Sequence, residues 1–386
     1  MSVKLFFLTT RGLESVSADE IAALPAVTIG RIGYRRIAAS CAGSLAPLLK
    51  LRTVDDAFLD LAAWGTVGRP RRTLTLLRDL SSRLDLRAAV ANLTRLRAVP
   101  QSPAFSVTAS FVGKRNYGAE EIKSAVSEGV MIRHDWRYAD DDAADLNVRV
   151  FIERETAFVG LRLGRRPLHE REYKKAHRAG SLKPPVAAAM LRLVGVAPGR
   201  SLLDPCCGVG TILAEAGKFG ATVWGGDIDT AAVSAARMNL RAAGIAANVN
   251  AWDARALPIA DGSVERIVSN LPWGRQITIS GSLALFYRDV CAEMQRVLAA
   301  GGRIALLTNA PQSALFSGLR CDGQFEISLY GQTPTILTFS SEKGAPASSR
   351  TGLAVKPARE DAGAPPDFNC FRASQRDMNA PPKIGS

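Results

Sequence analysis

The feature that most constrains this sequence is an alternation of short apolar strands and helices that begins at residue 201. Its first unit runs from a strand into a glycine turn and then a helix: Ser201-Leu202-Leu203-Asp204-Pro205-Cys206-Cys207-Gly208-Val209-Gly210-Thr211. Strands are expected near 202–204, 222–225, 248–251, 264–269 and 302–308, with helices between them. Phe325 to Tyr330 and Thr335 to Phe339 are expected to form a closing antiparallel pair. This pattern indicates a doubly wound parallel sheet, which binds its ligand at the carboxyl ends of the strands.

The glycine turn favours one kind of nucleotide-like cofactor over another. Gly208 and Gly210 let the backbone turn sharply and approach a ligand, and a helix that starts near Thr211 presents free amide groups. The third glycine of a dinucleotide-binding turn is missing, because Leu213 stands there, and Asp204 precedes the turn. A carboxylate would repel a phosphate but suits an ammonium group, so the turn favours S-adenosylmethionine over NAD.

Two further carboxylates follow strands of the same expected sheet. Asp227 lies close to the spacing of roughly 20 residues at which an acidic side chain binds ribose hydroxyls in such folds. Asp229 is better interpreted as the cap of the next helix. Asp253 follows the third strand and could accept from an adenine amino group, although an ordinary loop position is the alternative.

The fourth strand ends in Asn270-Leu271-Pro272-Trp273. An exocyclic amine of a nucleobase is a poor nucleophile because its lone pair is delocalised into the ring. The Asn270 side-chain oxygen and the Leu271 carbonyl could accept both of its N–H bonds, Pro272 would fix the carbonyl, and Trp273 could stack on the base. Alone the tetrapeptide occurs in ordinary turns, but after the glycine turn and the two carboxylates it indicates amine methylation.

The rest of the chain divides by composition into four segments. Residues 1–64 and 65–161 each suggest a small α/β domain, and the second is either an RNA-binding module or a plain scaffold. In the second, leucines from Leu74 to Leu96 have helical spacing, and Asp140-Asp141-Asp142 suggests a solvated loop. Alternating residues indicate strands at Phe105 to Phe111, Leu146 to Ile152 and Ala157 to Leu163. Residues 162–183 form a basic linker that carries 8 Lys/Arg against 2 Asp/Glu, which is +6 of the net charge of +13. Such a run indicates contact with a polyanion, with a solvated charged face as the alternative. Residues 343–386 are rich in Ala, Pro, Ser and Gly, so we expect disorder after a catalytic domain at 184–342.

The block 201–274 resembles the class I methyltransferase core, and residues 1–340 resemble the THUMP-domain RNA guanine-N2 methyltransferases. The resemblance also rests on Arg11-Gly12-Leu13-Glu14, Leu51-Arg52-Thr53, Phe105 to Phe111, Leu168 to Tyr173 and Leu182-Lys183-Pro184. It implies an α/β chain with a C-terminal Rossmann-like methyltransferase domain after N-terminal ferredoxin-like and THUMP domains. The Leu-Pro-Trp-Gly form is similar to the branch that acts at position 6 of tRNA.

The resemblance also implies a site and partners. The THUMP domain would grip the 3′ end of a tRNA, and Asn270 to Trp273 would hold a guanosine amine of the acceptor stem. S-adenosylmethionine would be held by Asp204, Pro205, Cys206, Gly208, Gly210, Thr211, Asp227, Ile228, Asp253 and Ala254. The expected RNA-binding residues are Arg165, Arg166, Arg171, Lys174, Lys175, Arg178 and Lys183.

Other functions remain open or are disfavoured by the composition. Methylation of ribosomal RNA or of a DNA amine, and a non-catalytic RNA-binding role, are the alternatives. No apolar run approaches the ~20 residues of a membrane span, and the six cysteines contain no Cys-x-x-Cys pair, so we expect neither a membrane protein nor a metal centre. A cytoplasmic monomer is the expectation.

Overall fold

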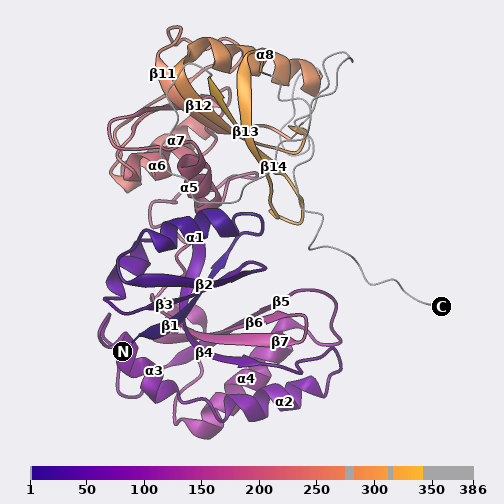
Figure 1. The fold of residues 1–386 in the computed structure, drawn as a ribbon. Helices are drawn as coiled ribbons and strands as arrows, with labels where there is room; N and C mark the ends of the chain where they lie inside the picture. The colour runs from indigo at the N-terminus through magenta and orange to yellow at the C-terminus, as the bar shows by residue number, and fades with distance from the viewer. Residues whose placement is uncertain (1, 274–281, 312–315, 342–386) are drawn as a thin grey trace, which may run out of the picture. The chain divides into compact units, whose positions relative to one another are not determined.

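The computed structural model describes residues 2–273, 282–311 and 316–341 (Figure 1). In the described part, two seven-stranded sheets are present, one in each half of the chain. The expected tail at 343–386 lies outside the described residues. No helix of the described part is long and apolar enough to cross a membrane.

The first sheet has the strand order β2-β3-β1-β4-β7-β6-β5. Its pairs are antiparallel except β5 with β6, which is parallel. The elements are β1 (Val3–Thr9), α1 (Glu14–Ala22), β2 (Val27–Gly33), β3 (Arg36–Cys41), η1 (Ala46–Lys50), β4 (Val54–Trp64), α2 (Thr73–Ser81), α3 (Leu86–Leu93), β5 (Phe105–Phe111), α4 (Ala119–Arg133), η2 (Asp141–Ala143), β6 (Leu146–Glu153) and β7 (Thr156–Arg162).

Alternation along the strands gives this sheet two different faces. Leu5 and Phe7 of β1 pack in a cluster that includes side chains of α1, α2, α3 and α4. The residues between them, Phe6 and Leu8, point to the opposite face and join a small cluster with Phe58 and Phe151. Because successive side chains of a strand point to opposite faces of the sheet, the two faces have different neighbours. One face packs against the helices, and the other carries the small cluster.

The expected boundary between residues 64 and 65 falls at the end of β4. This strand pairs with β1 on one side and with β7 on the other, so the two expected N-terminal domains contribute to one continuous sheet. Their separate domain status stays a prediction. The long helical pattern from Leu74 to Leu96 forms two helices, α2 and α3, and Asp85 caps the second by accepting from the Ala88 amide at 3.2 Å.

The second sheet has the strand order β10-β9-β8-β11-β12-β14-β13, and the strands from β10 to β12 are parallel. Its elements are α5 (Pro184–Leu193), β8 (Ser201–Asp204), α6 (Thr211–Lys218), β9 (Thr222–Asp227), α7 (Thr230–Ala243), β10 (Ala247–Ala251), β11 (Val264–Asn270), α8 (Leu283–Val297), β12 (Leu298–Thr308), β13 (Leu319–Glu326) and β14 (Thr335–Ser341). The order reverses between β8 and β11, which is where such sheets bind ligands.

Helices cover both faces of this sheet (Figure 1). Leu202 of β8 packs in the cluster that includes α5, α6 and α7, whereas the next residue, Leu203, packs with α8. The expected parallel strands are confirmed. The expected antiparallel pairing with Thr335 to Phe339 is confirmed at Phe325 and Glu326, but the paired strand, β13, begins at Leu319 and ends at Glu326 instead of spanning 325–330. Beyond Glu326, an isolated antiparallel bridge joins Leu329 to Gln332.

Candidate functional site

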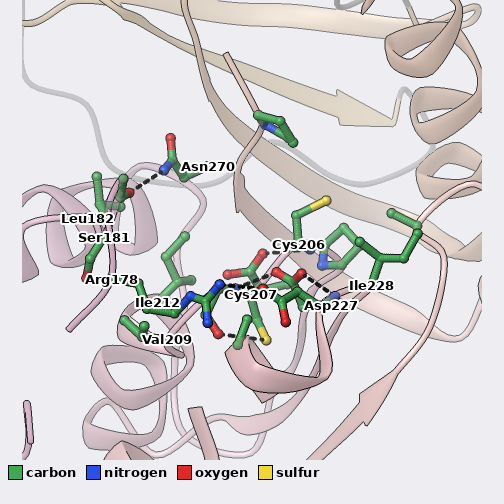
Figure 2. A pocket seen from close by; sticks show the side chains of 18 of the residues that line it. Arg178, Ser181, Leu182, Cys206, Cys207, Val209, Ile212, Asp227, Ile228 and Asn270 are labelled. Atoms are coloured by element: carbon green, nitrogen blue, oxygen red, sulfur yellow. Dashed lines mark hydrogen bonds and ion pairs between the residues drawn. The ribbon is translucent and has the colours of Figure 1, made fainter. Parts of the chain in front are cut away.

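A cavity of about 520 Å³ opens at the carboxyl ends of β8, β9 and β11 (Figure 2). Every residue expected to hold a cofactor lines it, except Gly210. Asn270 and Asp227 line the same cavity, although they come from strands on opposite sides of β8. The topology therefore brings the acidic strand ends and the amide of the Asn-Leu-Pro-Trp stretch to one place.

The two glycines shape the floor of the cavity. Gly208 (φ 52°) and Gly210 (φ 77°) both have the left-handed backbone conformation, which disfavours residues with a side chain. The Gly208 amide donates to Asp227 Oδ2 at 2.9 Å, so the turn is tied to the end of β9. A Cβ on Gly210 would lie 3.1 Å from the Cβ of Ala236, so a side chain at this position would crowd the packing of α6 against α7.

Asp204 is buried at the base of the cavity. Its Oδ1 accepts from the Ser269 hydroxyl at 2.8 Å and from the Cys206 amide at 3.3 Å. Burial raises the pKa of Asp204 to about 7, because charging a carboxyl away from water is unfavourable. A cation in the cavity would oppose that effect. Nearby, the buried Thr211 hydroxyl makes no hydrogen bond within the described residues.

The carboxylates after β9 and β10 have different local roles. Asp229 caps α7 by accepting from the Ala231 amide at 2.8 Å, so the interpretation as a cap is confirmed. Asp253 pairs with Arg255 at 2.7 Å, and these hydrogen bonds lower the pKa of Asp253. Ile228 is 70% exposed beside the cavity, which offers an apolar surface to a ring.

Asn270 carries an unsatisfied acceptor. Its Nδ2 donates to the Gly180 carbonyl at 3.4 Å, a long hydrogen bond (Figure 2). Its Oδ1 is buried and has no hydrogen-bond partner in the described part of the chain. The carbonyl of Pro272 accepts from the buried Tyr287 hydroxyl at 3.1 Å, which fixes its direction.

The other two residues of the tetrapeptide do not line the cavity. Leu271 is 1% exposed in the core, and Trp273 lies half-buried against the cluster of α5, α6 and α7. The aromatic side chain in the lining is Phe286 of α8, which sequence reasoning missed. The backbone segment 178–182 was also missed as part of the lining. The proline-initiated helix at Pro184 is the sequence signal that could have placed that segment beside the sheet.

The basic linker divides into exposed and internally paired residues. Arg165, Arg166 and Lys175 are exposed. Arg171 is 10% exposed and pairs with Glu215 at 3.0 Å, so its guanidinium is not offered to RNA. The remaining expected residues have polar or aromatic neighbours: Lys174 donates to the Leu182 carbonyl, Arg178 pairs with Asp229, and Lys183 lies over the Tyr330 ring.

A second cavity of about 270 Å³ lies on the face of the first sheet opposite its helices. Arg35, Arg149, His169 and Lys183 line it, together with Asp55, Asp56 and Asp141. Burial lowers the pKa of Arg149 to about 10, and its Nε has no hydrogen-bond partner among the described residues. Leu182 lines the first cavity and the next residue, Lys183, lines the second.

The acidic run at Asp140-Asp141-Asp142, expected as a solvated loop, participates in this face. Asp141 accepts from the Ser106 hydroxyl at 2.7 Å and pairs with Arg162 at 3.0 Å. Arg162 also pairs with the buried Asp56 at 2.8 Å. Among the described residues, no group of three or more His, Cys, Asp or Glu side chains could hold a metal ion.

Comparison with known proteins shows which family model and which relatives this chain resembles. Residues 171–316 match the family model described as "UPF0020: RMKL-like, methyltransferase domain". A tRNA (guanine(6)-N2)-methyltransferase of Thermus thermophilus is 35% identical over 216 residues, which are 54% of this chain and 62% of that protein. The U6 snRNA (guanine-N(2))-methyltransferase THUMPD2 of Bos taurus is 32% identical over 195 residues, which are 49% of this chain and 37% of that protein. The chain thus spans less than two thirds of the length of either relative.

Solved structures extend the likeness to both sheets. The crystal structure of TrmN from Thermus thermophilus has a TM-score of 0.69 at 28% identity and covers 88% of this chain and 100% of that one. A possible methylase from Clostridium difficile 630 also has a TM-score of 0.69, at 18% identity over 90% of this chain and 100% of that one, which shows the fold alone. The expected fold class, a Rossmann-like methyltransferase domain after an N-terminal α/β region, is confirmed. Residues 171–316 of this chain thus match the RMKL-like methyltransferase domain model.

Proposed function

We propose that this protein transfers a methyl group from S-adenosylmethionine to the exocyclic N2 of a guanosine in RNA, and that its target is position 6 of tRNA. One observation carries the proposal: acidic strand ends suited to a cationic cofactor line one cavity with Asn270, whose buried Oδ1 has no partner in the described part of the chain. The choice of tRNA and of position 6 rests on the activity of the Thermus thermophilus relative.

The donor set of the cavity fits the cofactor. Asp204 suits a cationic group near the glycine turn, Asp227 suits ribose hydroxyls at the end of β9, and Asp253 suits an adenine amino group. Ile228 would cover one face of the adenine ring. When bound, S-adenosylmethionine supplies a methyl group on a positively charged sulfur, which is already an activated leaving group. The protein then contributes mainly alignment.

Asn270 would hold the target amine. Its Oδ1 is a buried acceptor that finds no partner among the described residues, and a buried acceptor costs free energy until a donor reaches it. An N–H of the guanine amine is such a donor. Accepting this bond would orient the nitrogen lone pair toward the cofactor. Tyr287 holds the neighbouring carbonyl of Pro272 in place, and Phe286 supplies apolar surface for the base.

The exposed cations of the linker and the second cavity would hold the RNA. Arg165, Arg166 and Lys175 are exposed to phosphates, and Arg149 Nε, which has no partner among the described residues, lies in the second cavity. Arg178 lines the cofactor cavity, Lys183 lines the second cavity and Lys174 donates to the Leu182 carbonyl. Arg171 is removed from the set because its guanidinium pairs with the buried Glu215. Because phosphate contacts position RNA without reading its sequence, these residues would set register rather than choose a base.

The test is a map of the methylated nucleotide. The full chain would be incubated with labelled S-adenosylmethionine and unmodified tRNA, with ribosomal RNA and U6 snRNA in parallel, and the products analysed by nucleoside mass spectrometry. We expect N2-methylguanosine at position 6 of tRNA. Methylation confined to another RNA would refute the tRNA assignment, and cofactor binding by calorimetry without any methyl transfer would refute the enzymatic proposal.

A further inference from the structure

Glu215 connects the cofactor domain to the rest of the chain. It lies on α6, one turn after Thr211, and its carboxylate is fully buried. Glu215 Oε2 accepts from Arg52 Nε at 2.6 Å. Its Oε1 accepts from Arg171 Nε at 3.0 Å and from the Tyr173 hydroxyl at 2.7 Å. We call Glu215, Arg52, Arg171 and Tyr173 the Glu215 cluster.

The members of the Glu215 cluster come from three parts of the fold. Arg52 lies between η1 and β4 in the N-terminal half, and its amide donates to Glu20 of α1 at 3.1 Å. Arg171 and Tyr173 belong to the linker, and Arg171 Nη2 also donates to the Arg52 carbonyl at 2.9 Å. Thr211, at the start of α6, lines the cofactor cavity. One buried carboxylate thus ties the N-terminal half and the linker to the helix that forms the cavity wall.

Burial and the directed hydrogen bonds give the Glu215 cluster a defined geometry. Arg52 is 23% exposed and Arg171 10%, so both ion pairs are largely shielded from water. A buried ion pair adds little stability over apolar packing, but its hydrogen bonds work in one arrangement only. Apolar contact also joins the halves, because Leu13, the residue before α1, packs in the cluster that contains α5, but such contact has no preferred direction.

We propose that Glu215 is a positioning residue that fixes the distance between the RNA-holding surface and the cofactor cavity, and so selects which nucleotide is methylated. The inference rests on the proposed function. Cations that hold RNA lie in the second cavity, whereas Asn270 holds the amine in the first. If the RNA is bound at the second cavity, the distance between the two cavities determines which nucleotide reaches Asn270. A misplacement of about 1 Å can lower a rate about 100-fold.

The test compares two substrates in the variant Glu215→Gln. The first is full-length tRNA, which can reach both cavities. The second is a short RNA stem that contains the target guanosine but lacks the remote end of the molecule. We expect the KM for tRNA to rise at least about tenfold and methylation to spread to neighbouring guanosines. For the short stem, kcat/KM should stay within about twofold of the wild type, as should the cofactor Kd from calorimetry.

Controls separate positioning from folding and from the proposed function. Glu265→Gln removes a carboxylate near the start of β11, away from the cofactor cavity, where Glu265 pairs with Arg200. The kinetic constants for both substrates should not change in this variant. Tyr173→Phe and Arg52→Lys weaken the Glu215 cluster without burying an uncompensated charge and serve if Glu215→Gln does not fold. The inference would be overturned if kcat/KM fell equally for both substrates. It would also be overturned if the KM for tRNA did not change and methylation stayed at the nucleotide that the wild type methylates. Wild-type protein that methylates no RNA would instead refute the proposed function.

Discussion

The substitution Asn270→Ala should separate activity from stability. Asn270 Oδ1 is buried without a partner in the described part of the chain, and Nδ2 makes one hydrogen bond of 3.4 Å to the Gly180 carbonyl. A buried unsatisfied polar group costs about 1–3 kcal/mol, whereas a weak hydrogen bond contributes about 0.5 kcal/mol. Removing both should therefore raise the free energy of unfolding by about 0.5–2.5 kcal/mol, and each 1 kcal/mol corresponds to about 2–4 °C in Tm for a domain of about 150–250 residues.

The same substitution should reduce catalysis strongly. If Asn270 accepts from the reacting amine, alanine removes a preorganised hydrogen-bond partner, a loss that typically lowers kcat by about 10²–10³. Thermal unfolding and methyl transfer to tRNA would be measured on the same preparation, with cofactor Kd as a third quantity that should not change. Asn248→Ala, at an exposed position of β10, is the matched control. Retention of full kcat, or a Tm that falls by more than about 4 °C together with the loss of activity, would refute the reasoning.

Three further outcomes follow from the geometry. Binding of S-adenosylmethionine should release a proton near pH 7 and weaken as pH falls, because burial raises the pKa of Asp204 to about 7 and a bound cation lowers it. Calorimetry in buffers of different ionisation enthalpy measures the proton release, and Asp204→Asn should abolish that release. Gly210→Ala should lower Tm more than Gly244→Ala, because both have φ near 70° but only Gly210 lies against Ala236; equal shifts would contradict the packing argument. Lys183→Gln should weaken tRNA binding and lower the magnitude of its log–log salt slope by about 0.7–0.9, and an unchanged slope would exclude a phosphate contact.

The C-terminal sheet was predictable because its signals are local. The strands β8, β9 and β11 end in Asp204, Asp227 and Asn270. The helices after β8 and β9 have Gly210 and Asp229 as their N-cap residues. Since the carboxyl ends of parallel strands share one edge, sequence position alone placed Asp204, Asp227, Asp253 and Asn270 around one cavity. Phe286 escaped because a helix of strong apolar periodicity does not reveal which residue faces a ligand.

The N-terminal half was predictable in its elements but not in its assembly. Alternation identified β5, β6 and β7, but no pattern within β4 indicates that it pairs with both β1 and β7. Antiparallel pairing between strands far apart in sequence depends on which edges remain open after the local hairpins form. The start of the strand that pairs with β14 was misplaced for a related reason. Along β13, from Leu319 to Glu326, half-buried and exposed residues alternate, but Asp322 and Gly323 weaken the apolar signal.

Charge counting was informative for the linker as a whole and misleading for individual residues. The run 162–183 contains eight cations, and composition treats them alike. In the fold, Arg171 pairs with Glu215, an acid outside the run, whereas Arg165 and Arg166 are exposed. That acid lies 44 residues from Arg171, so only the packing of α6 against the linker brings them together. A basic segment can therefore bind RNA with one part and fix domain geometry with another, and the two roles are separated by burial rather than by sequence.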